Sequence, residues 1–418
     1  MAGALEGIRV LDCTQIIAGP LGASLLADMG ADVVKIEPLE GEPWRLQAEF
    51  VPKESRGYMV HNRGKRGIAI DLKHPDSDPI RRKLIAWADV LITNYRPGVP
   101  EQLKVDYPSA KAIRHDIIYC EGTAFGKEGP YAQLRGYDIV AQSMSGLTAL
   151  NQNINERGMP QPMAFAPADV ITGTIMAWGV TAALFHRART GEGQAINASL
   201  MHTALWVQSA AQEIPALDLE PRQIRLAALK ADRERGADIS EIYAERRKLM
   251  PELSGNIYYR QYKTKDSYIA IGCLGPGPRS RFRSALSIHD ARYDPGFTGS
   301  AVEVGAVLVE QCEAIFKTKT SDEWLEYLQA ADVACGPFRF LDELRDDPQV
   351  VANHFLTEYE HSMFGTLRGT APVATMHGSP TRIQRGSPTL GEHTDEVMAE
   401  LGLSAAEIAR LRENAVIG

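Results

Sequence analysis

The chain has 418 residues, of which 44% are hydrophobic and 23% are charged, and its formal net charge is −8. This length suffices for two domains with a large core. The negative charge argues against a general nucleic-acid-binding protein, which would carry a basic face. Five cysteines without a Cys-x-x-Cys pair argue against a zinc site or disulfide framework and suit a reducing cytosol.

Neither the N-terminus nor the apolar runs indicate export or a membrane. Residues 1–7 contain no basic leader and no apolar h-region, so no secretion signal is visible. The most apolar long run, 170–185, is expected to be too short and too rich in Thr and Gly to span a bilayer. The sequence therefore predicts a soluble, cytoplasmic protein that contacts no membrane.

Short β-branched runs alternate with amphipathic stretches in the first half of the chain. Helices are predicted over 23–29 and 78–88, and Pro79 suits the first turn of the second one. This alternation is typical of βαβ units, so we predict an α/β fold with a doubly wound, Rossmann-like parallel sheet. A long apolar helix after Asp169 would pack against that sheet. The predicted strands are 8–12, 32–37, 67–72, 90–94 and 117–120.

The chain changes character after about Leu205. Residues 217–249 are charged and helix-prone, which favours a solvated helical connector over a binding patch. Residues 256–262 and 268–272 predict a hairpin. Together with helices over 303–316 and 323–330, this hairpin predicts a smaller α+β domain.

The remainder reads as loop-rich until a capping box, Ser404 with Glu407, starts a short terminal helix. We divide the chain into four predicted parts. They are a large Rossmann-like domain (1–205), a helical linker or insertion (206–255), a small α+β domain (256–353) and a return segment that completes the large domain (354–418).

One turn resembles a dinucleotide-binding fingerprint. Gly19-Pro-Leu-Gly22 follows a predicted strand, and Glu37 ends the next strand near the distance expected for a ribose-binding acid. The full Gly-x-Gly-x-x-Gly is absent, so we favour a simple tight turn and rank an NAD-dependent oxidoreductase last. The chain also lacks Gly-x-Ser-x-Gly, His-Glu-x-x-His and P-loop motifs, which removes the commonest hydrolase, metalloprotease and NTPase interpretations.

Basic and amide side chains gather after several predicted strands. Ligands bind at the carboxyl ends of open parallel sheets, so this pattern favours an anionic, phosphorylated ligand over a solvated loop rim. The residues concerned are Lys35, Arg45, Asn62, Arg63, Lys65, Lys73, Asn94 and Arg96.

Asp169 is a lone carboxylate where a polar, Pro-rich loop meets the long apolar segment. The local sequence leaves two roles open, a helix cap or a nucleophile towards an activated acyl group. The helix dipole would keep the carboxylate ionised in either role. Asp138 is expected to cap a helix over 139–144. The run 272–277 is either a bent loop or a glycine-rich flap over a reactive intermediate.

Together these segments resemble the family III coenzyme A transferases, which share a fold with α-methylacyl-CoA racemase. The resemblance covers nearly the whole chain in order, with 217–249 as the exception. The matching stretches are 5–12 with 18–20, 26–38, 62–66 with 71–73, 94–98, 126–131, 135–138, 183–187 with 190–194, and 391–396.

The resemblance implies an enzyme that moves CoA from an acyl-CoA thioester to a free carboxylic acid, with CoA as substrate and no tightly bound cofactor or metal. Asp169 would be the nucleophile, Tyr137 and Asp138 would organise the site, and Gly275 and Gly277 would belong to a glycine loop that shields the intermediate. An interlocked-ring homodimer is also implied. The residues implied in CoA binding are Ile16, Lys35, Arg45, Leu72, Lys73, Asn94, Tyr95, Arg96 and Arg135.

Two positions argue against racemisation. Racemases carry a histidine where this chain has Tyr137 and a glutamate where it has Gly275, so both proton carriers are missing. Ile17 stands where the formyl/oxalate branch carries glutamine, which puts that substrate pair in doubt. A racemase-type enzyme and a non-catalytic CoA-binding protein are kept as alternatives. The donor and acceptor acids depend on a pocket around Ile16, Ile17, Trp44, Met144 and the second domain, which the sequence does not assemble.

Overall fold

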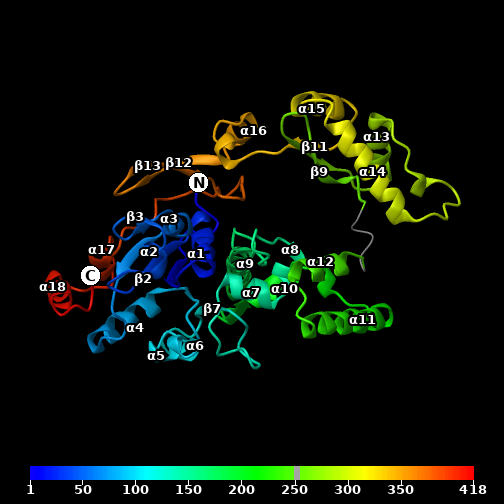
Figure 1. Cartoon of the computed structure of the whole chain (residues 1–418). Coiled ribbons are helices and arrows are strands. Elements are labelled where there is room, and N and C mark those ends of the chain that lie inside the picture. The colour runs from blue at the N-terminus through cyan, green and yellow to red at the C-terminus, as the bar shows by residue number, and fades with distance from the viewer. Residues whose placement is uncertain (249–254) are drawn as a thin grey trace. The chain divides into compact units, whose positions relative to one another are not determined.

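The computed structural model describes residues 1–248 and 255–418 (Figure 1). Residue 249 of the predicted charged helical segment and residues 249–254 of the predicted linker lie outside them. Contacts divide the chain into two compact units. The large unit comprises Met1–Asn155, Pro160–Glu213 and Gln349–Gly418, and the small unit comprises Glu156–Met159 and Ile214–Pro348. The four-part division predicted from the sequence stays a prediction.

A six-stranded sheet forms the centre of the large unit, in the order β5-β2-β1-β6-β7-β8. All neighbouring strands are parallel, and the order reverses direction between β1 and β6, as in doubly wound folds. The predicted α/β fold with a parallel sheet is therefore confirmed. The strands are β1 (Arg9–Cys13), β2 (Asp32–Glu37), β5 (Arg66–Ala69), β6 (Val90–Thr93), β7 (Ile118–Thr123) and β8 (Ala195–Ser199).

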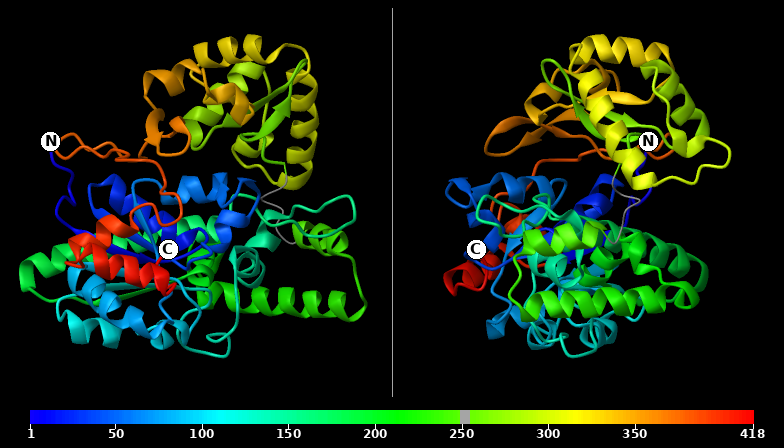
Figure 2. Two further views of the ribbon diagram at one scale, coloured as in Figure 1. Left: turned by 90° about the vertical axis from the view of Figure 1, so that its left-hand side faces the viewer. Right: turned by 45° about the vertical axis from the view of Figure 1, so that its right-hand side comes forward.

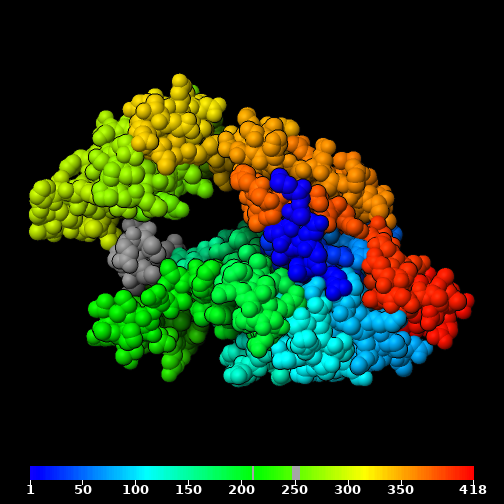
Figure 3. Space-filling view, turned by 180° about the vertical axis from the view of Figure 1, so that it is seen from behind, coloured from blue at the N-terminus to red at the C-terminus, as the bar shows by residue number. Residues whose placement is uncertain are grey.

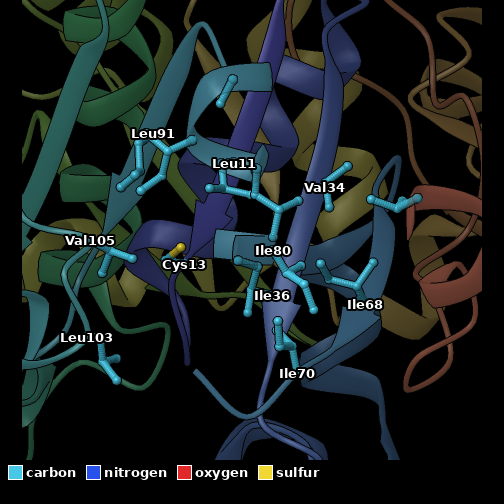
Figure 4. Packing of buried hydrophobic residues seen from close by; sticks show 14 of the residues in the cluster. Leu11, Cys13, Val34, Ile36, Ile68, Ile70, Ile80, Leu91, Leu103 and Val105 are labelled. Carbon is cyan, nitrogen blue, oxygen red and sulfur yellow. The ribbon is translucent and has the colours of Figure 1, made fainter. Parts of the chain in front are cut away.

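Helices cover both faces of this sheet, because successive strand residues point to opposite sides (Figure 2). Leu11 and Val34 pack with α4 (Asp78–Trp87), α6 (Tyr107–Ile113) and the C-terminal helices on one face, part of which Figure 4 shows. Their neighbours Val10 and Val33 pack on the other face with α1 (Ala18–Asp28) and α9 (Pro167–Thr190). β8 was missed by the sequence reasoning, because Ala195–Ser199 carries a single β-branched residue.

Helix α9 is longer than the sequence suggested. It has 24 residues and is long and apolar enough by composition to cross a membrane, so the prediction that this run is too short was wrong. Just over half (56%) of its most apolar window is buried within the protein, and Met176 and Val180 pack on the sheet. Trp178 and Phe185 are exposed.

The small unit is built on an antiparallel sheet of β9 (Tyr259–Lys263), β10 (Tyr268–Gly272) and β11 (Cys335–Pro337), which confirms the predicted hairpin. Its core includes stacked Tyr262 and Phe316, with Phe282 and Trp324 beside them. The predicted helices also form. The helices of this unit are α11 (Pro215–Glu234), α12 (Ile239–Lys248), α13 (Pro276–Leu286), α14 (Ala301–Phe316) and α15 (Ser321–Ala330).

The C-terminal segment is more regular than expected. Its hairpin of β12 (Leu356–His361) and β13 (Gly365–Thr370) was missed, because both strands are mostly polar. The segment, orange to red in Figure 3, belongs to the large unit, where an Ile70–Ile417 bridge and ion pairs of Arg66 with Glu396 and Glu400 connect its end to β5. The predicted capping box at Ser404 is confirmed at the start of α18 (Ala405–Glu413).

The remaining helices and strands are short. They are α2 (Pro43–Leu46), β3 (Glu49–Val51), β4 (Glu54–Ser55), α3 (Arg56–Asn62), α5 (Val99–Gln102), α7 (Asp138–Met144), α8 (Leu147–Asn151), α10 (Leu200–Trp206), α16 (Pro348–Ala352) and α17 (Thr394–Glu400).

Candidate active site

A cavity of about 300 Å³ opens at the carboxyl ends of β1, β6 and β7. It lies where the strand order reverses, which is the usual ligand site of a doubly wound sheet. Six of the predicted site residues line it together. They are Ile16, Asn94, Arg96, Arg135, Tyr137 and Asp169.

Asp169 lies in the first turn of α9 and its side chain is buried, with 8% of the residue exposed. No donor among the described residues hydrogen-bonds its carboxylate. Burial, with the neighbouring Asp138 carboxyl as a second cause, raises the pKa of Asp169 to about 7. Burial therefore opposes the helix dipole, which was expected to keep this group ionised.

Asp138 caps the helix for which Asp169 was one candidate cap. Its Oδ1 accepts hydrogen bonds from the backbone N–H groups of Ala168 (2.8 Å) and Asp169 (3.2 Å), while Oδ2 accepts one from the Gln142 amide. Its own helix α7 has no side-chain cap, so the predicted capping of 139–144 was wrong. The cap comes from a different helix, which leaves the Asp169 carboxylate available to the cavity.

The loop after β1 is clamped against the cavity by side chains from other elements. Asn94 accepts a hydrogen bond from the Gln15 N–H (2.8 Å) and donates one to the Gln15 carbonyl (2.7 Å). Ile16 has φ of 72°, a conformation that is strained for a β-branched residue. Its N–H donates to the buried Glu42 carboxylate at 2.7 Å. Sequence reasoning missed Gln15 and Glu42, whose partners are distant in the chain.

Lys35 and Arg45 line none of the described cavities, so their predicted contact with CoA is not supported. Both are fully buried. The Lys35 Nζ donates to the Thr14 carbonyl at 2.8 Å and lies 3.4 Å from Glu42. The guanidinium of Arg45 pairs with Glu37 at 2.7 Å and with Glu54 at 2.8 Å. Because buried charges require partners, these two cations hold the loops behind the cavity instead.

Asn62, Arg63 and Lys65, three further members of the predicted cluster of basic and amide side chains, are also buried. The Lys65 Nζ donates to Asp12 at 2.7 Å and to the side-chain oxygen of Asn62 at 2.8 Å, and burial lowers the pKa of Lys65 to about 8. Arg63 pairs with Asp28 at 2.7 Å. Asp12 and Asp28 lie 53 and 35 residues away from these cations along the chain, so nothing local in the sequence indicated these pairs.

Replacing Arg45 by alanine should destabilise the fold strongly, since it leaves Glu37 and Glu54 buried without a counter-charge. We expect a loss of about 3–5 kcal/mol in the free energy of unfolding. Urea denaturation of Arg45→Ala beside Arg82→Ala, an exposed position, measures it. Equal effects of the two substitutions would contradict the assignment of Arg45 to this network.

Two further cavities continue from the first along the sheet edge. One, of about 400 Å³, shares Gln15 with the first cavity and includes Leu72, Lys73 and Tyr95. The other, of about 380 Å³, shares Arg96 with the first and again includes Leu72 and Lys73. The side chains of Lys73, Arg96 and Arg135 are exposed, and no carboxylate among the described residues pairs with them. The predicted CoA residues that remain therefore lie along one continuous edge.

A fourth cavity, of about 450 Å³, meets the first at Ile16, Tyr137 and Asp169. It includes Ile17 and Trp44, as expected for a substrate pocket, whereas Met144 lies outside its lining. Its described lining holds no Lys, Arg or His. The other residues that line it are Pro43, Gln47, Asp138, Ile139, Gln142, Pro162, Met163, Ala164 and Ala166.

Gly275 and Gly277 belong to the small unit, at the start of α13. Gly275 has φ of 85°, a backbone conformation that favours glycine. The role of this loop as a lid over the intermediate stays a prediction.

The profile of CoA-transferase family III matches residues 5–394. The chain therefore belongs to this family and is a CoA-transferase. It is 31% identical over 412 residues to the succinate–glutarate CoA-transferase of Agrobacterium fabrum, covering 95% of each protein. It is 29% identical to the formyl-CoA:oxalate CoA-transferase of Streptomyces coelicolor, covering 100% of both chains.

A solved structure agrees with this assignment. A CAIB/BAIF family protein from Brucella suis superposes with a TM-score of 0.72 at 27% identity, covering 96% of this chain and 100% of its own. The family resemblance stated from the sequence motifs is confirmed.

Proposed function

We propose that this enzyme moves CoA from an acyl-CoA to a free carboxylic acid, with Asp169 as the nucleophile. The observation that carries the proposal is a buried carboxyl group that no described residue hydrogen-bonds, at the junction of a cavity with arginines and a cavity whose described lining holds no cation. A group with a pKa of about 7 is half ionised near neutral pH and is poorly solvated, which suits nucleophilic attack on a thioester.

The proposed reaction has two matched halves. An Asp169 oxygen attacks the thioester carbon, the C–S bond breaks, and a mixed anhydride and CoA thiolate form. The thiolate then attacks the Asp169 carboxyl carbon, releasing the donor acid and leaving an Asp169–CoA thioester. The acceptor carboxylate attacks that thioester, which expels CoA thiolate and gives a second anhydride. The thiolate then attacks the acceptor's carbonyl carbon, which forms the new acyl-CoA and frees the Asp169 carboxylate. No net proton is consumed, and exclusion of water protects both anhydrides.

CoA is assigned to the edge formed by the three adjoining cavities. Exposed cations there, Lys73, Arg96 and Arg135, suit a polyanionic ligand, and Leu72 and Tyr95 offer apolar surface between them. The thioester would then lie at Asp169, with Asp138 and Tyr137 around it. Gly275 and Gly277 are proposed to cover the intermediate. CoA acts as substrate, and no tightly bound cofactor is part of the proposal.

The test is CoA exchange between a panel of acyl-CoAs and free carboxylic acids, followed by intact-mass analysis of the protein after it is mixed with acyl-CoA alone. A CoA adduct that maps to Asp169 supports the proposal. Exchange of α-protons with heavy water in the absence of CoA transfer would favour the racemase alternative instead.

We also propose a cytoplasmic homodimer of the interlocked kind that the family resemblance implies. Helix α11 has no buried residue, and four large apolar side chains on it are exposed. Exposed apolar patches of this kind are typical of protein–protein interfaces. The four side chains are Leu217, Leu219, Ile224 and Leu226.

Light scattering should give twice the chain mass for the native protein. The double substitution Leu217→Glu with Ile224→Glu should lower the dimer fraction, because it places charges in an apolar contact. Gln223→Glu, an exposed polar position on the same helix, is the matched control and should stay dimeric. A native protein with the mass of one chain would refute the dimer.

A further inference from the structure

The two cavities that meet at Asp169 differ in charge. Arg96 and Arg135 line the first, so the phosphorylated part of CoA has counter-charges on that side. Lys, Arg and His are absent from the described lining of the second. If CoA extends along the cationic side, the acyl group of the thioester enters the second cavity.

The second cavity offers little to a charged acyl group. Ile17, Trp44 and Met163 supply apolar surface, and its acidic lining groups are Asp138 and Asp169. The Gln142 amide is already bonded, because it donates to Asp138 and exchanges two hydrogen bonds with the Met163 backbone (3.1 and 2.9 Å). The neutral donors left in the lining are the exposed Gln47 amide and the Tyr137 hydroxyl. A second carboxylate on the acyl chain would therefore find no cation and would lie near two carboxyl groups, which is costly.

We propose that the acyl groups handled by this enzyme are uncharged and apolar, so that its acids are monocarboxylic acids with a short aliphatic or aromatic chain. This inference rests on the proposed function of Asp169. It separates the chain from relatives whose names specify glutarate, succinate or oxalate, acids that carry a second carboxylate. The apolar lining gains free energy from burying hydrocarbon.

The experiment measures the first half-reaction alone. Wild-type protein is mixed with isobutyryl-CoA, benzoyl-CoA, succinyl-CoA or glutaryl-CoA at subsaturating concentration, without an acceptor, and the CoA adduct is followed by intact mass. We expect the two uncharged donors to react at least about tenfold faster than the two with a free carboxylate. Equal or faster reaction of succinyl-CoA or glutaryl-CoA would overturn the inference and leave the proposed function standing. An adduct with none of the donors would refute both.

A charge introduced into the cavity provides a second test. Gln47 is an exposed residue of the lining, so Gln47→Arg adds a cation without disturbing the core. The ratio of the succinyl-CoA rate to the isobutyryl-CoA rate should rise about tenfold in this variant. Gln212→Arg, exposed and outside the described cavities, should leave the ratio unchanged. An unchanged ratio in Gln47→Arg would count against this cavity as the acyl pocket.

Discussion

Asp169→Asn should lose CoA transfer almost completely, because an amide neither attacks a thioester nor forms the anhydride. We expect kcat to fall by at least about 10³-fold, the scale on which loss of a covalent nucleophile acts. The substitution preserves the shape of the side chain. It also removes a carboxyl group whose charged form is disfavoured by burial, as the raised pKa of Asp169 indicates. The fold should therefore remain intact, with unfolding free energy equal to or above that of the wild type.

Two readouts separate chemistry from structure for Asp169→Asn. Exchange between an acyl-CoA and a carboxylic acid reports turnover, and intact mass after mixing with acyl-CoA reports the adduct. Binding of CoA itself, measured by calorimetry, should change little, because the assigned CoA residues are Lys73, Arg96 and Arg135. Near-normal turnover in Asp169→Asn would remove Asp169 as the nucleophile and leave only a positioning role.

The single-turnover rate of adduct formation should rise with pH through about 7 and level off above it. The reactive species is the Asp169 carboxylate, whose pKa is raised to about 7, so protonation at lower pH removes the nucleophile. Well below that midpoint the rate should fall about tenfold per pH unit, as expected when one proton must leave. A rapid-quench series from pH 5 to 9 in buffers of about equal ionic strength gives the profile.

Asp138→Asn should move this profile to lower pH. The variant keeps an oxygen that can accept the Ala168 and Asp169 N–H bonds, but it removes the negative charge that helps to raise the Asp169 pKa. Burial, the larger cause, persists, so the midpoint should stay above the ordinary aspartate value of 3.8. Asp138→Ala is the companion variant, and loss of the cap should cost it about 1 kcal/mol of stability. An unmoved midpoint in Asp138→Asn would show that the two carboxyls do not interact.

The proposed chemistry assigns different roles to two aspartates that lie about thirty residues apart in the sequence. At a helix start, a single carboxylate that satisfies backbone N–H groups is held in hydrogen bonds and is a weaker nucleophile. Here Asp138 supplies the cap from α7, so Asp169 is buried without a hydrogen-bond donor from the residues that the structure describes. The same contact places the Asp138 carboxyl near the Asp169 carboxyl, which contributes to the raised pKa of Asp169.

Strained loop geometry contributes on the other side of the site. Ile16 holds a left-handed backbone conformation, and Glu42 and Asn94 secure this residue and the preceding Gln15. Behind them, Lys35 balances the Glu42 charge in the interior. Lys35, which was predicted to contact CoA, therefore supports the loop whose residue Ile16 lines both cavities.

Periodicity and motif order were enough to predict the doubly wound sheet, the hairpin of the small unit, the terminal capping box and the family. These features are local, because strand and helix patterns repeat within a few residues and each motif is read along the chain. The strand prediction failed where the sequence lacked a pattern of β-branched or alternating apolar residues. β8 carries a single β-branched residue, and β12 and β13 are mostly polar.

The sequence by itself determined which residue types are present at the carboxyl edge of the sheet, and Asp169 among them. Only the tertiary structure distinguished the buried cations Lys35 and Arg45 from the exposed Lys73 and Arg96, because burial and ion pairing depend on segments that meet in space. It also assigned the helix cap to Asp138 and separated a cationic cavity from an apolar one on either side of Asp169. The physical reason is that the charge state and role of a side chain follow from its surroundings, which are assembled from distant parts of the chain.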